Sequence, residues 1–231
     1  MGGYDPVIFD LDGTIVDTVE LIRRSFRYAT RRVLKKELPD REIMAYVGQP
    51  LMTQMVQLSP QHAQELYDVY RAYNHRVHDE FIRGYAGIDE ALAGLREAGK
   101  RLGLVTSKSA DTTKMAFRAV GLEQHFDVVV TASDTTEHKP RPAPILLCLE
   151  RLGAGRERLG AGRERLGAGH ERPIYIGDSP YDVAAGKAAG IATAAVTWGL
   201  FSADDLADAG PDHLLTRPDE IVAVCLEGEE G

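Results

Sequence analysis

Two aspartates end a short apolar run near the start of the chain, in the stretch VIFDLDGTIVD. Asp10 and Asp12 are two positions apart, so both carboxylates point to the same side of an extended strand. Like charges this close repel each other, and a bound cation would offset the repulsion. Gly13 lets the chain turn and brings backbone N–H groups towards an anion, and Thr14 adds a hydroxyl. The stretch alone fits a metal-phosphate site or two solvated loop acids; an EF-hand is excluded because its glycine would fall at Ile15.

Hydroxyl groups and a lysine follow later apolar runs. The stretch VTSK places Thr106 and Ser107 where hydroxyls and free backbone N–H groups can bind phosphoryl oxygens, although such residues also end strands as simple turns. Lys139 lies in HKPRPAP, whose prolines keep the segment extended and can hold the lysine stem rigidly. The alternative for Lys139 is an ordinary solvated lysine.

A second pair of acids occurs in YIGDSPYD. Asp178 ends an apolar run, and Ser179 and Pro180 are typical of an N-cap and a first helical position. Asp182 falls in the first turn of that helix and can return to the same site as Asp178. An acid-rich helix start, favoured by the helix dipole, is the other interpretation.

Apolar runs alternate along the chain with stretches of helical spacing. These runs and stretches predict the strands and helices that position the candidate residues. Such alternation predicts an α/β fold with a Rossmann-like parallel sheet covered by helices on both faces. Ligands of such sheets bind beyond the carboxyl ends of the strands, where the candidate residues lie. The expected strands are Val7–Phe9, Leu102–Val105, Val128–Thr131, Ile174–Ile176 and Ala194–Thr197.

One interval between strands is too long for a single crossover helix. It runs from Asp12 to Leu102 and holds several helical patterns, which predicts a helical-bundle cap inserted after the first strand. We expect a core of residues 1–14 and 86–231 and a cap of residues 15–85, with Gly84–Gly87 as the return hinge.

Residues 150–170 form three tandem copies of a heptad, ERLGAGR, ERLGAGR and ERLGAGH. A coiled coil is disfavoured, because each heptad offers only one strongly apolar position and each glycine costs a helix about 1 kcal/mol. Removing residues 157–170 leaves an ordinary link between a helix and a strand. We therefore expect a surface insertion within the core that takes no part in chemistry.

The composition narrows the classes of partner and location. The net charge of −8 argues against nucleic acid, which calls for a basic surface. The stretch Ile191–Phe201 is too short to span a bilayer, and no secretory signal is evident, so no membrane partner is expected. Two cysteines in 231 residues fit a reducing cytoplasm. The sequence leaves a monomer and a dimer equally open.

The stretches DLDGT, VTSK, KPRP and GDSPYD together resemble the four motifs of the haloacid dehalogenase superfamily of phosphohydrolases. This resemblance implies that Asp10 is a nucleophile that forms an aspartyl-phosphate and that Asp12 protonates the leaving group and then activates water. It also implies that Thr106 and Lys139 hold the phosphoryl group. Mg²⁺ would be bound by Asp10, Asp178 and the backbone carbonyl of Asp12.

Two stretches of the cap bear on the substrate, which the resemblance implies is a small phosphate-bearing molecule. AYVGQPL, with Gly48 and Gln49, resembles the cap loop of phosphoglycolate phosphatase, and YRAYNHRVHDE, with His75, resembles a cap helix of a bacterial inorganic pyrophosphatase branch. Arg23 and Arg27 belong to a basic stripe that would suit a compact anion if it faced the site; otherwise it is a solvated face. Pyrophosphate is the expected substrate, with 2-phosphoglycolate as the alternative.

Two other functions use similar groups. A phosphomutase would transfer phosphate between positions of a sugar on the same scaffold. A phospho-accepting receiver domain also combines strand-end acids, a hydroxyl and a lysine around Mg²⁺, but the inserted cap and the second acid, Asp12, argue against a switch.

Overall fold

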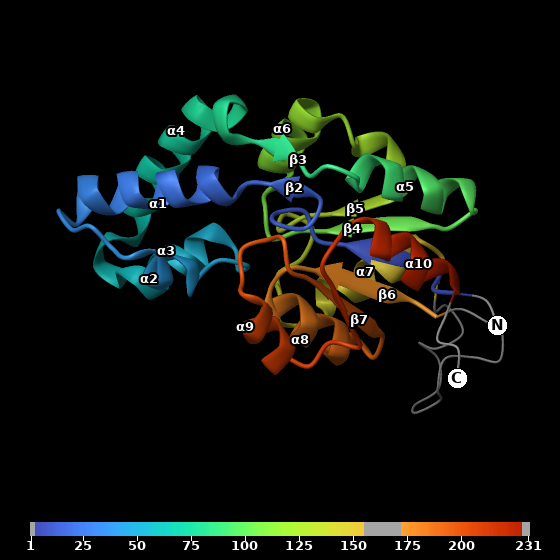
Figure 1. Cartoon of the computed structure of the whole chain (residues 1–231). Helices are drawn as coiled ribbons and strands as arrows, with labels where there is room; N and C mark the ends of the chain where they lie inside the picture. The colour runs from blue at the N-terminus through green and yellow to red at the C-terminus, as the bar shows by residue number, and fades with distance from the viewer. Residues whose placement is uncertain (1–2, 155–171, 228–231) are drawn as a thin grey trace.

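A parallel β-sheet forms the centre of the molecule (Figure 1). The computed structural model describes residues 3–154 and 172–227, and most of the predicted insertion, residues 155–170, lies outside them. Within the described residues, the central sheet has six strands in the order β5-β4-β1-β6-β7-β8, and all neighbours pair in parallel. The predicted fold class is confirmed. The strands are β1 Val7–Phe9, β4 Leu102–Val105, β5 Val128–Val130, β6 Ile174–Gly177, β7 Ala192–Val196 and β8 His213–Leu215.

Alternate side chains of each central strand enter different layers of the core. In β1, Val7 and Phe9 join the cluster that includes side chains of α5, α6 and α10, whereas Ile8 joins the cluster on α7 and α8. Both faces are therefore covered, as continuous apolar strands require. The helices of the core are α5 Ile88–Glu97, α6 Ala110–Val120, α7 Ala143–Arg151, α8 Pro180–Ala189, α9 Ala203–Asp208 and α10 Asp219–Glu227, with a short 3-10 helix at Glu123–His125.

Residues 15–85, which we call the cap segment, contain a helical cluster beside the sheet (Figure 1). Its apolar interior includes Phe26, Ile43, Met55 and Leu66, all almost fully buried. The helices are α1 Val19–Val33, α2 Asp40–Met44, α3 Leu51–Leu58 and α4 Ala63–Phe81, with a 3-10 turn at Pro60–His62. No helix among the described residues is long and apolar enough to cross a membrane.

The chain enters and leaves the cap segment through two adjacent short strands. β2 Val16–Asp17 and β3 Arg83–Gly84 pair in antiparallel fashion, so both connections lie side by side. A narrow two-strand connection of this kind allows two bodies to move relative to each other with little change elsewhere.

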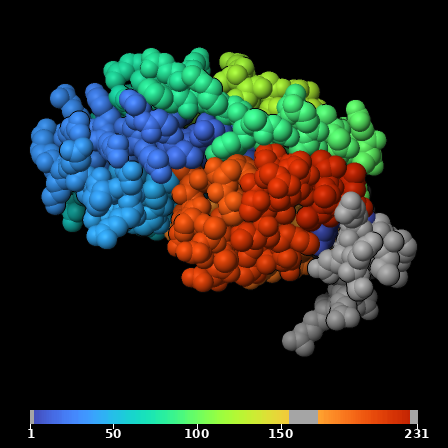
Figure 2. Space-filling view, viewed as in Figure 1, coloured from blue at the N-terminus to red at the C-terminus, as the bar shows by residue number. Residues whose placement is uncertain are grey.

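The cap segment also contacts the core at the carboxyl end of the sheet, and Figure 2 shows the two in broad surface contact. The Ser107 hydroxyl donates a hydrogen bond of 2.8 Å to the carbonyl of Gly48 in the cap segment. The Gln49 amide donates to the Tyr181 hydroxyl at 3.1 Å, and Leu200 packs against the cap cluster. The strand ends are therefore covered by the cap segment.

Candidate active site

Asp10 and Asp12 lie on the loop that follows the central strand β1. The backbone N–H of Asp10 donates to the carbonyl of Ile176 at 2.8 Å, which ties the loop to β6. Asp10 is 5% exposed, whereas Asp12 is partly open to solvent. One oxygen of Asp12 accepts a hydrogen bond from the Thr18 hydroxyl at 2.7 Å. The two acids thus share a strand end but differ in burial.

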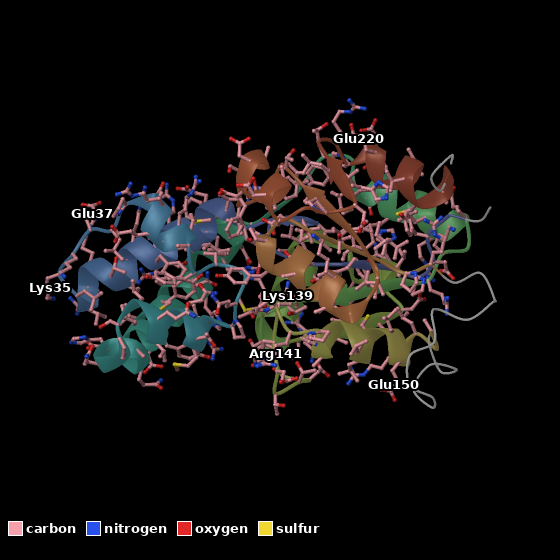
Figure 3. All side chains as sticks on the ribbon, turned by 90° about the horizontal axis from the view of Figure 1, so that it is seen from below. Lys35, Glu37, Lys139, Arg141, Glu150 and Glu220 are labelled. Carbon is pink, nitrogen blue, oxygen red and sulfur yellow. The ribbon has the colours of Figure 1, made fainter. Side chains whose placement is uncertain are left out.

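Lys139 connects two of the buried acids. Its ammonium group lies 2.8 Å from Oδ1 of Asp10 and 2.6 Å from Oδ1 of Asp182. The lysine is 3% exposed, and Figure 3 places it in the middle of the molecule, far from the cap residues Lys35 and Glu37. The sequence prediction of a rigidly held lysine agrees with this position.

Asp178 follows β6, and its carboxylate contacts the loop that contains Leu200. Its Oδ2 accepts a hydrogen bond of 2.7 Å from the backbone N–H of Leu200. A Cβ atom at Gly13 or at Gly199 would overlap the Asp178 side chain, and Gly13 also has φ +75°. Both glycines are therefore required for the close approach of the two loops to this carboxylate.

Asp182 is fully engaged with groups of the protein. Its Oδ2 accepts from the backbone N–H and hydroxyl of Ser179 in a capping box at the start of α8. Its Oδ1 accepts from Lys139 and from the Tyr175 hydroxyl, the latter at 3.1 Å. Asp182 therefore positions Lys139 and has no oxygen left over for a further ligand.

The electrostatics of these groups reflect their burial. Burial raises the pKa of Asp10 to about 7, although Lys139 opposes the shift, and burial together with Asp182 and Asp10 raises the pKa of Asp178 well above its usual value. Burial works against the charge of Lys139, but the carboxylates of Asp10 and Asp182 outweigh it and raise the lysine pKa. One lysine thus faces three buried carboxylates, a combination that an additional cation would stabilise.

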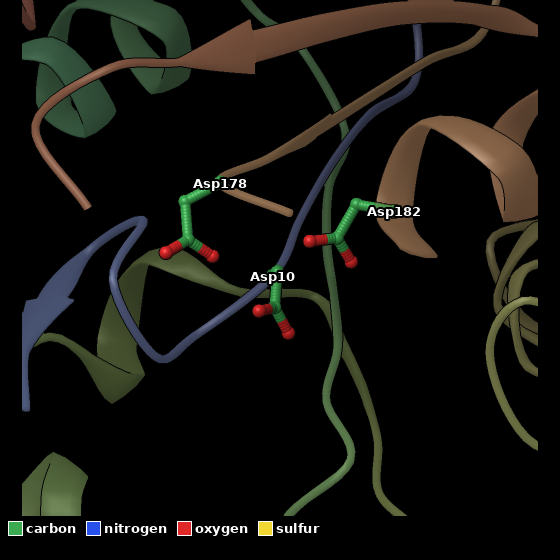
Figure 4. Close-up of side chains that lie close together, drawn as sticks. All are labelled: Asp10, Asp178 and Asp182. Atoms are coloured by element: carbon green, nitrogen blue, oxygen red, sulfur yellow. The ribbon is translucent and has the colours of Figure 1, made fainter. Parts of the chain in front are cut away.

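Asp10 and Asp178 fit a divalent cation. Oxygen atoms of Asp10, Asp178 and Asp182 lie within 4.8 Å of one another (Figure 4). Asp10 and Asp178 each keep one carboxylate oxygen without a hydrogen-bond partner among the described residues, whereas Asp182 does not. Mg²⁺ is commonly held by one or two carboxylates, with water and substrate oxygens completing its shell.

A cavity of about 210 Å³ lies over these groups, between the core and the cap segment. Asp10, Asp12, Lys139 and Asp178 line its core side, together with Thr106 and Ser107. The backbone N–H of Lys108 donates to the Thr106 hydroxyl at 3.2 Å, which orders the loop after β4. Most of the predicted core residues therefore meet in one cavity, whereas Gly13, Thr14 and Asp182 are absent from its lining.

A sequence model of haloacid dehalogenase-like hydrolases matches residues 7–196, a span that includes all of these groups. The chain belongs to this family.

Two relatives, both named as pyrophosphatases, align with nearly the whole of this chain. Pyrophosphatase PpaX of Bacillus velezensis is 34% identical over 218 residues, which are 94% of each protein. Pyrophosphatase PpaX of Listeria innocua is 33% identical over 233 residues, covering 99% of each. The protein is therefore an enzyme of the phosphatase and pyrophosphatase class.

Solved structures agree with the family fold. A haloacid dehalogenase-like hydrolase from Streptococcus pneumoniae superimposes with a TM-score of 0.78 at 24% identity, covering 95% of this chain and 97% of the other. A Lactobacillus plantarum protein, provisionally named a phosphoglycolate phosphatase, gives 0.79 at 22% identity, with coverage of 96% and 99%. At these identities the likeness shows the fold.

The hydrolase brings some of the predicted cap residues to the cavity and not others. Gly48, Gln49 and His75 line it. Arg23 and Arg27 are absent from its lining and instead face Asp40, at 3.9 Å and 2.7 Å, respectively. These two arginines of α1 are thus directed to an acid of the cap segment and not to the cavity. In the core, the buried side chain of Thr14 is also absent from the lining, and its hydroxyl has no hydrogen-bond partner among the described residues.

Sequence reasoning missed two basic residues of the hydrolase site. Lys108 lines the cavity and forms an ion pair of 3.0 Å with Asp12. Arg71 lines it from α4. A signal was present, because Tyr67, Arg71, Asn74 and His75 recur at helical spacing and all four reach the cavity.

Proposed function

We propose that this hydrolase is a Mg²⁺-dependent phosphohydrolase that forms an aspartyl-phosphate on Asp10 and acts on inorganic pyrophosphate. The observation that carries the proposal is the Asp10 carboxylate. It is buried at a strand end, one of its oxygens is bound to Lys139, and the other has no partner among the described residues. A carboxylate held in this way can attack a phosphorus atom only where positive charge offsets the repulsion between two anions.

The first half of the reaction follows from the positions of the acids. An oxygen of Asp10 attacks phosphorus, and the bond from phosphorus to the leaving oxygen breaks. Asp12 gives its proton to that oxygen, while Lys139 and the hydroxyl of Thr106 hold the non-bridging oxygens; the Ser107 hydroxyl can join them only when it is released from the Gly48 carbonyl. The products of this step are an aspartyl-phosphate and a released phosphate.

The second half regenerates the enzyme. Asp12, now a carboxylate, accepts a proton from a water molecule, which attacks the phosphorus of the aspartyl-phosphate. The bond between phosphorus and the Asp10 oxygen breaks, and phosphate leaves. Asp10, Asp178 and the Asp12 carbonyl would hold Mg²⁺, which would offset the charge of the phosphoryl oxygens.

Two observations favour pyrophosphate as the substrate. The relatives that cover this chain almost fully are named pyrophosphatases. The cavity is small and is covered by the cap segment, and it has basic side chains on both of its walls, Lys108 from the core and Arg71 from α4. A compact and highly charged anion can be recognised by such charges alone, without an apolar surface.

The test is phosphate release from pyrophosphate, 2-phosphoglycolate and p-nitrophenyl phosphate, with Mg²⁺ and with a chelator. We expect pyrophosphate to have the highest kcat/KM and Asp10→Asn to lower it by about 10³-fold or more, because the nucleophile is lost. Asp208→Asn, which removes an exposed acid of α9, is the matched control and should leave the rate unchanged. An Asp10→Asn variant as active as the parent would overturn the mechanism, and a preference for phosphoglycolate would overturn the substrate.

A further inference from the structure

Arg71 is a cation without a counter-charge in the cavity. Among the lining residues, Lys139 is ion-paired with Asp10 and Asp182, and Lys108 with Asp12. Arg71 makes no ion pair with any described residue; its Nη1 donates to the Tyr67 hydroxyl at 3.2 Å, and its guanidinium lies 5.5 Å from the centre of that ring. The arginine is therefore oriented by an aromatic neighbour and not neutralised.

No other arginine of the described cap segment lines the cavity. Three on α1 form ion pairs with acids of the same segment at 2.6–2.7 Å: Arg24 with Glu20, Arg27 with Asp40 and Arg31 with Glu37. Arg76, also on α4, is exposed and lies over the rings of Tyr73 and Tyr28, outside the cavity lining. Arg71 is thus the cap arginine that both lines the cavity and lacks an acid partner among the described residues.

Positive groups of the cap segment and the core converge at this point. His75, one turn after Arg71 on α4, also lines the cavity. Burial lowers the pKa of His75, and the charges of Arg71, His78 and Lys108 lower it further. Arg71 from α4 and Lys108 from the core thus line the same cavity, with His75 one turn from Arg71.

The position of Asp12 indicates which part of the substrate binds near Lys108. Lys139 lies beside Asp10, where the transferred phosphoryl group must bind, whereas Lys108 lies 3.0 Å from the proton-transferring Asp12. Asp12 must contact the leaving oxygen. Lys108 therefore lies where the leaving group carries its charge, and Arg71 lines the same cavity from the cap segment.

We propose that Arg71 and Lys108 form a subsite for the second phosphate of a diphosphate substrate, with His75 at its edge. The inference rests on the proposed function and deepens it, because it assigns the selection of pyrophosphate over monoesters to two residues. When the bond between the transferred phosphorus and the bridging oxygen breaks, the electron pair stays on that oxygen, which takes the proton of Asp12. The remaining charge of the departing phosphate is stabilised by Lys108 and Arg71.

The experiment compares a diphosphate with a monoester. Arg71→Gln should lower kcat/KM for pyrophosphate by about 30-fold or more, because a charge-assisted contact to the leaving phosphate is lost, and should change p-nitrophenyl phosphate turnover by less than about threefold. The inhibition constant of methylenediphosphonate, which cannot be hydrolysed, should rise in parallel. Arg71→Lys should recover part of the loss, and Arg76→Gln on the same helix should have no effect.

Circular dichroism and the melting temperature of each variant separate a folding defect from a lost contact. Lys108→Met provides a second test, because this variant should also bind methylenediphosphonate more weakly than the parent enzyme. Equal losses on both substrates, or a loss on 2-phosphoglycolate alone, would overturn the diphosphate subsite. If the parent enzyme released phosphate from none of pyrophosphate, 2-phosphoglycolate and p-nitrophenyl phosphate, the proposed function itself would fail. Normal turnover of pyrophosphate by both Arg71→Gln and Lys108→Met would overturn only the subsite.

Discussion

Burial raises the pKa values of the Asp10 and Asp178 carboxyl groups above their ordinary value of 3.8. Between the ordinary pKa of 3.8 and the value of about 7 for Asp10, the folded metal-free enzyme binds protons that the unfolded chain has released. Its stability should therefore fall as the pH rises through this window. Mg²⁺ must displace the same protons, so its apparent affinity should rise with pH up to about pH 7 for Asp10, and further while Asp178 still holds a proton.

This competition can be measured as a melting-temperature shift caused by Mg²⁺. We expect a larger shift at about pH 8 than at about pH 6, because fewer protons compete for the carboxylates at the higher pH. Asp178→Asn should abolish most of the shift at both values, and Asp208→Asn should preserve it. A shift independent of pH would show that neither Asp10 nor Asp178 loses a proton when the metal binds.

The core residues of the site could be predicted because they adjoin strand ends, where the fold requires ligands to bind. The roles of Lys108 and Arg71 could not be predicted, because these roles depend on which acids lie beside the two side chains in the folded protein. Lys108 acquires its importance from Asp12, almost one hundred positions earlier, and Arg71 from the absence of an acid near it among the described residues. Arg23 and Arg27 illustrate the converse, since their acid partner, Asp40, comes from another helix.

At the scale of elements, contacts between the cap segment and α8 should govern access to the cavity. The Tyr181 hydroxyl accepts from Gln49 at 3.1 Å and donates to the Ala45 carbonyl at 3.4 Å. Tyr181→Phe removes these bonds without creating a large void. The bond of 3.1 Å contributes about 1 kcal/mol and the bond of 3.4 Å is too long to add much, so the closed arrangement should be disfavoured and kcat/KM for pyrophosphate should fall about fivefold.

The matched control for this contact is Tyr28→Phe, on an exposed tyrosine of α1 that stacks on Tyr73. Steady-state kinetics of both variants, with melting temperatures, would separate closure from stability. An unchanged kcat/KM in Tyr181→Phe would show that this contact does not govern closure of the cap segment.

The elements themselves were predicted unevenly. The central strands follow from their apolar runs, whereas β2 and β3 have two residues each and carry no periodic signal. β8, with the sequence HLL, begins with a polar residue and exposes one of its two leucines, Leu214, so its pattern is too weak to stand out. Short strands such as these depend on the neighbour with which they pair.

Considered as a whole, the molecule assembles opposite charges from distant parts of the chain. The acids come from β1 and β6 of the core, and the unneutralised arginine comes from α4 of the cap segment. The chain connects these two sides through the paired strands β2 and β3. Burial of the acids strengthens their attraction for a cation, and coverage by the cap segment brings Arg71 to the same cavity.

The tandem heptads provide the last test, at the scale of the whole chain. The described residues on either side are α7, which ends at Arg151, and β6, which begins at Ile174. Ile174 is at the amino end of β6 and Asp178 follows its carboxyl end, roughly 13 Å away at the rise of a strand. The described residues that follow the repeat therefore lead into the amino end of β6, the end of the strand opposite Asp178.

Deletion of residues 157–170 should leave kcat/KM for pyrophosphate within about twofold of the parent, because shortening a connection changes its closure entropy only slightly and the site is remote. Deletion of one copy, residues 164–170, is the matched control and should behave in the same way. Kinetics and melting temperatures of both proteins check this. A large loss of turnover in the longer deletion, with the melting temperature unchanged, would assign the repeat a role in catalysis.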